Sequence, residues 1–244
     1  MIALGVAGGC GAAVDGVRHF ALEQIRTDLI LSVPSERTGT YRYWRQAPDD
    51  RRAGAVDFVR GWYLEHRAGR TSPDGTGPRD LWVLNRGGDG FGRVTVTGRR
   101  AADLSGGWAR LDPAKLKYSW PSARSAAGDP AGSIVLVDEA VTARLDAAGR
   151  YSGTVDLLAV VDAGLPPVAP GHLAALGPAA RRAPFKAVLD GRGRLTEMSV
   201  SVPPVAGFPD ASITCGYGYD DVRFPEVRAE EPATADLYRM LEGG

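Results

Sequence analysis

The chain has 244 residues, which is enough for one large domain or two ordinary ones with a buried core. Its 29 basic and 29 acidic side chains balance, so we expect no nucleic-acid partner. The 32 glycines and 17 prolines form about a fifth of the chain, against roughly an eighth on average, which indicates many turns between short strands. No apolar run approaches the roughly 18 to 20 residues of a membrane-spanning helix.

The first nine residues are small and apolar, and they lead into Cys10 through an Ala-Gly-Gly sequence. This pattern resembles the lipobox before the lipidated cysteine of bacterial lipoproteins, so Cys10 is a candidate lipidation site. Two features depart from the pattern: no basic residue precedes Cys10, and Ala7 replaces the usual leucine. We interpret residues 1–14 as a signal remnant or as a flexible start, and residues 15–244 as a single domain.

The next part of the chain predicts one helix followed by strands. Apolar residues recur at helical spacing over Val14–Ile30, with Asp15 as a candidate N-cap. Beyond this helix the apolar residues alternate, as in strands with one buried face. The predicted strands are Thr38–Gln46, Ala55–His66, Leu81–Asn85, Phe91–Thr97 and Gly106–Asp112. The Arg-Gly-Gly-Asp-Gly sequence before Phe91 predicts a five-residue hairpin loop, and the loop over 70–79 is expected to be exposed.

Two further helices are expected between the later strands. Asp129 and Pro130 suit a helix start, and apolar spacing predicts an amphipathic helix of about four turns that ends at Gly149. A strand over Tyr151–Val161 and a short helix over Gly171–Arg182 follow. The chain ends in an extended piece and a short helix, Ala233–Leu241.

The segment Ala183–Val202 predicts a β-hairpin in which both strands bury one face. Phe185 and Met198 must share that face, which requires an even number of loop residues. A two-residue turn on Gly191 and Arg192 satisfies this condition and sets Lys186 opposite Glu197.

Four segments also carry a family pattern. They are the Asp-Gly-Arg-Gly-Arg-Leu turn with its Ser-Val-Ser-Val-Pro exit, the Gly-Gly-Trp-Ala-Arg-Leu-Asp sequence from Gly106, the segment from Asp129 with the Gly-Arg-Tyr-Ser-Gly-Thr-Val-Asp-Leu sequence after it, and the final Tyr-Gly-Tyr-Asp-Asp-Val-Arg-Phe-Pro. Over residues 56–232 they resemble actinobacterial lipoproteins of the LolA-like superfamily, the LppX/LprG group. The resemblance implies a half-open β-barrel with a helical lid, and transport or presentation of lipids or lipoproteins.

The many strands and few helices predict an α+β fold, in which a strongly curved antiparallel sheet has helices over its concave face. The apolar side chains on this face would line a cleft for an acyl chain or another lipid, or would pack against the helices as a closed core. For any single residue, the core is the better prediction. The candidate ligand-lining residues are Val155, Leu157, Phe185, Ala187, Met198, Val200 and Tyr217.

Residue patterns typical of catalysis are absent from the sequence. The three histidines lie in unrelated segments, and neither a nucleophile elbow nor a phosphate-binding loop is present. We therefore expect no enzymatic activity, catalytic residue, metal or cofactor. The pairs Asp220-Asp221, Glu230-Glu231 and Arg181-Arg182 are better interpreted as solvated surface than as ion or head-group sites. Cys215 is expected to be buried, and a disulfide to Cys10 is a less favoured alternative.

These observations lead to a hypothesis of function. We expect a lipid-binding lipoprotein that is monomeric, and anchored through Cys10 to the outer face of the cytoplasmic membrane or secreted. The alternative is an envelope sensor or protein-interaction module whose own side chains fill the curved sheet and which has no lipid ligand.

Overall fold

The computed structural model describes residues 10–48, 50–71, 78–96, 107–116, 129–146, 149–165, 168–227 and 232–242. Eleven strands form one antiparallel sheet in the order β6-β5-β4-β3-β2-β1-β11-β10-β9-β8-β7. Its ends, β6 and β7, do not pair with each other, so the sheet is open. The strands are β1 (Thr40–Ala47), β2 (Asp50–Asp57), β3 (Trp62–Thr71), β4 (Pro78–Arg86), β5 (Asp89–Val96), β6 (Ala109–Leu111), β7 (Ala140–Leu145), β8 (Arg150–Val155), β9 (Ala183–Leu189), β10 (Leu195–Val202) and β11 (Ala211–Gly218).

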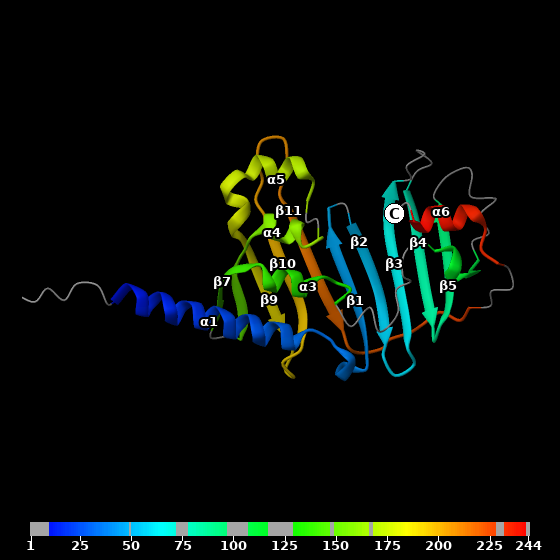
Figure 1. The fold of residues 1–244 in the computed structure, drawn as a ribbon, viewed down its shortest axis with the longest axis horizontal. Coiled ribbons are helices and arrows are strands. Elements are labelled where there is room, and N and C mark those ends of the chain that lie inside the picture. Colours follow the sequence, from blue (N-terminus) through cyan, green and yellow to red (C-terminus); the bar gives the residue numbers. More distant parts are fainter. Residues whose placement is uncertain are drawn as a thin grey trace, which may run out of the picture.

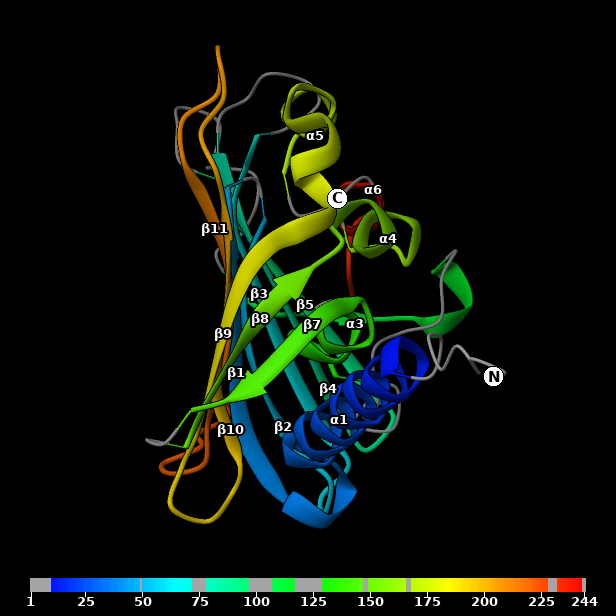
Figure 2. The same cartoon turned by 90° about the vertical axis from the view of Figure 1, so that its left-hand side faces the viewer.

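The helices lie on one side of this curved sheet (Figures 1 and 2). They are α1 (Cys10–Ser32), α3 (Ser133–Asp138), α4 (Leu157–Asp162), α5 (Pro170–Leu176) and α6 (Ala235–Glu242), with short 3-10 turns at Glu36–Thr38, Pro113–Lys115 and Gly177–Arg182. Helix α1 packs on β7 and α3, and its first half projects beyond the edge strand β7 (Figure 1). The expectation of a curved antiparallel sheet with helices is thus confirmed.

Three glycines of the sheet stand where a side chain would collide with the neighbouring strand. Each faces an aromatic residue on the paired strand: Gly54 faces Tyr43, Gly153 faces Phe185, and Gly216 faces Trp44. A Cβ atom on the first two would collide with a backbone carbonyl oxygen of the next strand. Glycine kinks of this kind allow a sheet to curve, and the ring of the partner covers the missing side chain.

Alternating burial divides the side chains between two faces, and we call the face toward the helices the inner face. The main core fills the space between the helices and the inner face of the half of the sheet that runs from β1 to β7. A second cluster joins α6 to the inner face of β4 to β6. On the outer face, the apolar side chains of Ala55, Leu64 and Leu84 pack against Phe224 and its neighbours in segment 222–227. The C-terminal part of the chain therefore contacts both faces at this end of the sheet.

Several predicted elements need correction. The expected helix from Asp129 to Gly149 is the six-residue α3 followed by strand β7. Three of the apolar residues that set the helical spacing, Ile134, Val137 and Val141, are β-branched, and the backbone pairing with β8 takes the second half of the segment into the sheet. The strand expected over Tyr151–Val161 ends at Val155, because the Asp156 carboxylate accepts backbone N–H groups at the start of α4.

The segment Ala55–His66 is predicted as one strand, but it contains the end of β2, a turn and the start of β3. The backbone N–H of Arg60 donates to the Asp57 carboxylate at 2.9 Å, and Gly61 adopts the positive φ of 69° that the turn requires. The first helix begins at Cys10, so Asp15 lies inside it and is not its cap. The β4–β5 hairpin is confirmed, with a turn shortened to Gly87 and Gly88.

The β9–β10 hairpin is confirmed, but its expected register is wrong by two positions. Lys186 faces Ser199, not Glu197. The loop runs from Asp190 to Arg194, because the Asp190 carboxylate accepts the backbone N–H groups of Arg192 and Arg194, each at 2.9 Å. A bulge between Leu195 and Glu197 restores the alternation, so the two apolar sets still share the inner face.

Candidate functional site

The structure brings the seven candidate lining residues together on the inner side of the sheet. Six lie on β8 to β11, and Leu157 begins α4. Each is at most 2% exposed, and all belong to the main core. The register places Phe185 opposite Val200 and Ala187 opposite Met198, so these side chains form one continuous apolar surface.

Helix α3 is fixed to this surface by buried polar groups. The Tyr217 hydroxyl donates to the Asp129 carboxylate and lies 2.6 Å from the Ser133 hydroxyl. Burial, together with the negative charge of Asp129, raises the Tyr217 pKa well above its ordinary value, so the phenol stays protonated and acts as the donor. The same carboxylate accepts the backbone N–H groups of Ala131 and Ile134 at 3.1 and 2.7 Å. These bonds position α3 over β11.

Cys215 lies beside this anchor and is completely buried, as expected from the sequence. It is a free thiol, so the alternative of a disulfide with Cys10 is wrong. Its Sγ atom is 3.0 Å from the carbonyl oxygen of Ala131. Burial raises the pKa of the thiol far above its ordinary value, because the thiolate would be desolvated.

A buried polar network spans β1 to β3, and two of its members, Tyr43 and Tyr63, belong to the main core. The Tyr63 hydroxyl lies 2.7 Å from the Tyr43 hydroxyl and donates to the Glu65 carboxylate at 2.6 Å. The Arg67 guanidinium donates to the same carboxylate. On the adjoining strands, Asp50 accepts from Arg45 and Arg52. Burial alone would raise the Glu65 pKa, but Arg67, Tyr63 and Arg52 outweigh it, so the pKa is lowered and Glu65 is an anion at neutral pH.

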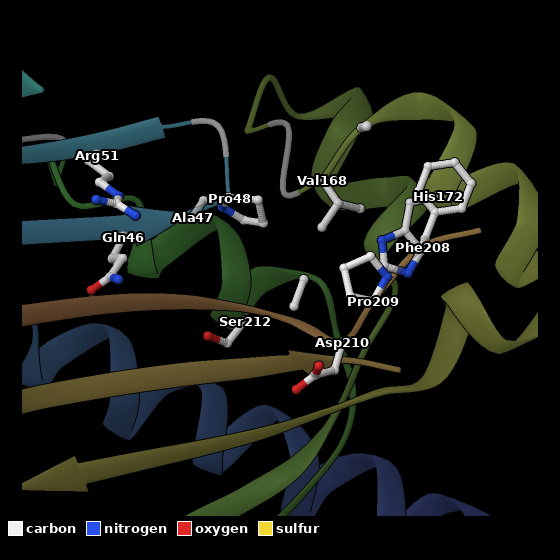
Figure 3. Close-up of a pocket in the computed structure, with 12 residues that line it drawn as sticks. Gln46, Ala47, Pro48, Arg51, Val168, His172, Phe208, Pro209, Asp210 and Ser212 are labelled. Atoms are coloured by element: carbon white, nitrogen blue, oxygen red, sulfur yellow. The ribbon is translucent and has the colours of Figure 1, made fainter. Parts of the chain in front are cut away.

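One pocket of about 360 Å³ opens where β1, β11 and the α5 segment meet (Figure 3). The β1–β2 turn, the residues around α5 and the loop between β10 and β11 each contribute one wall. The lining residues are Gln46, Ala47, Pro48, Arg51, Val168, Ala169, His172, Phe208, Pro209, Asp210, Ala211 and Ser212. This size lies within the range of small-molecule sites, and the lining is mostly apolar with a few polar side chains, as is usual for such sites.

Part of the pocket lining is an aromatic pair. The His172 and Phe208 rings are stacked 5.0 Å apart at 12°. His172 is 4% exposed, and its Nε2 atom lies 3.0 Å from the carbonyl oxygen of Pro203, which fixes the ring. Ala47 and Val168, which also line the pocket, belong to the main core, so the pocket adjoins the buried surface of the candidate lining residues.

None of the seven candidate lining residues lines this pocket, and none of the pocket residues was predicted from the sequence as a ligand site. The pocket is formed by three segments far apart in the chain, and none of them carries a motif. Of the charged pairs considered above, Arg181 binds Asp156 at 2.8 Å and Asp221 binds Arg223 at 3.1 Å, whereas Glu230-Glu231 lies outside the described residues.

Neither a metal site nor a membrane-spanning helix is found in the part of the chain that the structure describes. Within it, no group of three or more histidine, cysteine or acidic side chains is placed to hold a metal ion. No helix there combines the length and apolar character required to cross a membrane. Cys10 begins α1, and the residues before it lie outside the described ranges, so lipidation at Cys10 stays a prediction.

The comparisons with known proteins do not assign the chain to a family. No family model matches it, and no curated protein matches it. Among solved structures, a porin-like protein from Bacteroides uniformis is 9% identical, with 77% of this chain and 98% of that chain covered at a TM-score of 0.22. At that score the similarity carries no inference about fold or function.

Proposed function

We propose that this protein is a non-enzymatic binding protein of the cell envelope that holds an apolar ligand, such as an acyl chain, between the curved sheet and the helices. In this proposal the sheet acts as a half-open barrel and the helices act as its lid. The observation that carries it is the continuous apolar surface of Phe185, Ala187, Met198 and Val200, which is covered by short helices and not by a second sheet.

Two of the covering helices, α4 and α5, are suited to rearrangement. Helices α4 and α5 have only six and seven residues, one residue links β8 to α4, and a 3-10 turn links α5 to β9. Short helices gain little stability of their own and depend on packing against their neighbours. A ligand that supplies the same apolar contacts would therefore replace helix packing at a modest net cost. The buried surface would then become the lining of a cleft.

The second candidate is an interaction module with a self-filled core. It is favoured by the complete burial of the seven candidate residues, which are at most 2% exposed. In that case the protein would recognise a partner through its outer surface, and the polar and aromatic networks of the inner side would serve stability alone. The two candidates differ in whether apolar ligand is taken up.

Attachment to the membrane is part of the first proposal. If Cys10 carries a lipid, helix α1 begins at the anchor and connects it to β7 and α3. A single acyl chain gives only marginal membrane binding, whereas the diacylated cysteine of a lipoprotein would hold the protein at the outer face of the cytoplasmic membrane. Without the lipid the protein would be secreted. We propose a monomer without a nucleic-acid partner.

Native mass spectrometry of the Cys10→Ser protein purified from a bacterial host, followed by organic extraction, tests this proposal. A stoichiometric lipid that is released on denaturation supports the carrier. A ligand-free mass, together with no uptake of a fluorescent fatty acid, would support the interaction module instead.

A matched pair of variants makes the test specific to the inner face. Phe185→Leu creates space on that face, whereas Val188→Ala on the same strand alters a side chain that is 40% exposed. A carrier should shift its acyl-chain length preference in the first variant and keep it in the second. A filled core should lose stability in the first variant without gaining uptake.

A further inference from the structure

The pocket beside His172 carries opposite charges on different walls. Arg51 comes from β2, and Asp210 comes from the loop before β11 (Figure 3). Both side chains are exposed. Among the residues that the structure describes, neither takes part in an ion pair, although other arginines of β1 to β4, such as Arg45 and Arg67, are bound to a carboxylate. Two opposite charges that share a pocket without pairing are available to a ligand.

The other lining residues indicate which parts of that ligand are polar and which are apolar. Phe208 packs against Gly171 at the start of α5, where an added Cβ atom would lie 3.0 Å from the ring, so the aromatic wall is already in contact with the helix. Gln46 and Ser212 add a hydrogen-bonding amide and a hydroxyl near the two charges. Beyond them, Ala47 and Val168 are 5% and 7% exposed and lead into the main core. The pocket is therefore polar at its opening and apolar at its inner wall.

We infer that this pocket binds a zwitterionic head group, with an anionic phosphate or carboxylate at Arg51 and an ammonium group at Asp210. A guanidinium is well suited to oxyanions, and a carboxylate to a charged amine. The apolar remainder of the molecule extends along Val168 toward the inner face. This inference rests on the proposed function for the lipid part, but the head-group site itself depends on the pocket alone.

Isothermal titration calorimetry of the full-length Cys10→Ser protein tests the inference with three probes. They are dihexanoylphosphatidylethanolamine, dihexanoylphosphatidylglycerol and glycerophosphoethanolamine, each below any micelle concentration. The zwitterionic lipid should bind about tenfold more tightly than the anionic lipid, because Asp210 attracts the ammonium group, whereas the neutral glycerol of the anionic lipid offers Asp210 no positive charge. Equal affinities for the two lipids would overturn the inference.

Charge-neutralising variants locate the site. Arg51→Gln and Asp210→Asn should each weaken binding of the zwitterionic lipid about fivefold to tenfold. Asp210→Asn should also reduce the discrimination against the anionic lipid. Arg42→Gln on β1 and Asp162→Asn on α4 remove the same charges at exposed positions outside the pocket, and should leave both affinities unchanged. Equal effects of the pocket and control variants would refute the assignment of the site.

The third probe separates this inference from the proposed function. If glycerophosphoethanolamine binds as tightly as the lipid and depends equally on Arg51 and Asp210, the head-group site is supported and the apolar carrier is overturned. If a fluorescent fatty acid binds while the two lipids are not distinguished, the carrier stands and the head-group site is overturned.

Discussion

Replacement of Glu65 by glutamine should destabilise the protein strongly, because Glu65 is the anion at the centre of the buried network on β1 to β3. The side chain is 3% exposed, accepts a hydrogen bond from Tyr63 at 2.6 Å and is bound by Arg67. Glutamine keeps the size and one acceptor oxygen, but it leaves the Arg67 guanidinium without its counter-charge. The change therefore isolates the charge from the packing.

The size of the effect follows from the burial of the two partners. Removal of one member of a fully buried ion pair costs about 3 to 5 kcal/mol. The Arg67 side chain is 21% exposed, so water can partly solvate it after the substitution. We therefore expect the free energy of unfolding to fall by about 2 to 3 kcal/mol at neutral pH. Glu197→Gln, at an exposed position of β10, is the matched control and should stay within about 0.5 kcal/mol.

The effect should also depend on pH. The Glu65 pKa is lowered in the folded protein, so its ionised form stabilises the fold above the unfolded pKa of about 4.3. This contribution is lost as the pH falls through the folded pKa. The difference between wild type and Glu65→Gln should therefore be full at pH 7 and shrink below about pH 4. Urea denaturation followed by circular dichroism measures it, and a loss below about 0.5 kcal/mol, or one that is independent of pH, would refute the reasoning.

Three further perturbations test other parts of the structure. Gly54→Ala adds a methyl group that collides with a backbone carbonyl of β3. It should lower the free energy of unfolding, measured by urea denaturation, by about 1 to 3 kcal/mol. Gly107→Ala places its methyl group in open space and should change this free energy little. In Cys10→Ser protein, Cys215 should not react with Ellman's reagent until urea unfolds the chain, and a rapid native reaction would contradict its burial. Phe224→Ala removes a ring that packs on the outer face, and should lower the free energy of unfolding in the same urea assay by about 1 to 2 kcal/mol. An unchanged unfolding midpoint would show that segment 222–227 contributes no packing energy.

The parts of the fold that could be predicted are those encoded by local alternation. Parity alone predicts that Phe185 and Met198 share one face. The prediction holds although the loop has an odd number of residues, because a bulge after Leu195 restores the alternation. The chain reversals were harder to predict. Val59 is 86% exposed in the turn after β2, yet its apolar side chain continued the strand pattern and concealed the turn.

The helix boundaries and the pocket depended on information that local patterns do not contain. Strand β7 follows a helix because β8 offers it a hydrogen-bonding edge, a tertiary effect that overrides helical spacing. The pocket joins Arg51, His172 and Asp210 from three distant segments, and none of these residues is unusual in its local sequence. Only the order of the strands brings them together.

The strand order also sets the sequence in which the protein can fold. Strands β1 to β6 pair only with their chain neighbours, and so do β7 to β11, which makes two local meanders joined by a single seam between β1 and β11. The residues paired across that seam, such as Tyr43 and Tyr217, are about 170 positions apart in the chain. Loop-closure entropy makes such a contact slow to form, so we expect the two meanders to form first and the seam last. During synthesis, the edge of β1 stays unpaired until β11 has left the ribosome. We expect aggregation mainly in this interval, because an unpaired strand edge can pair with another chain.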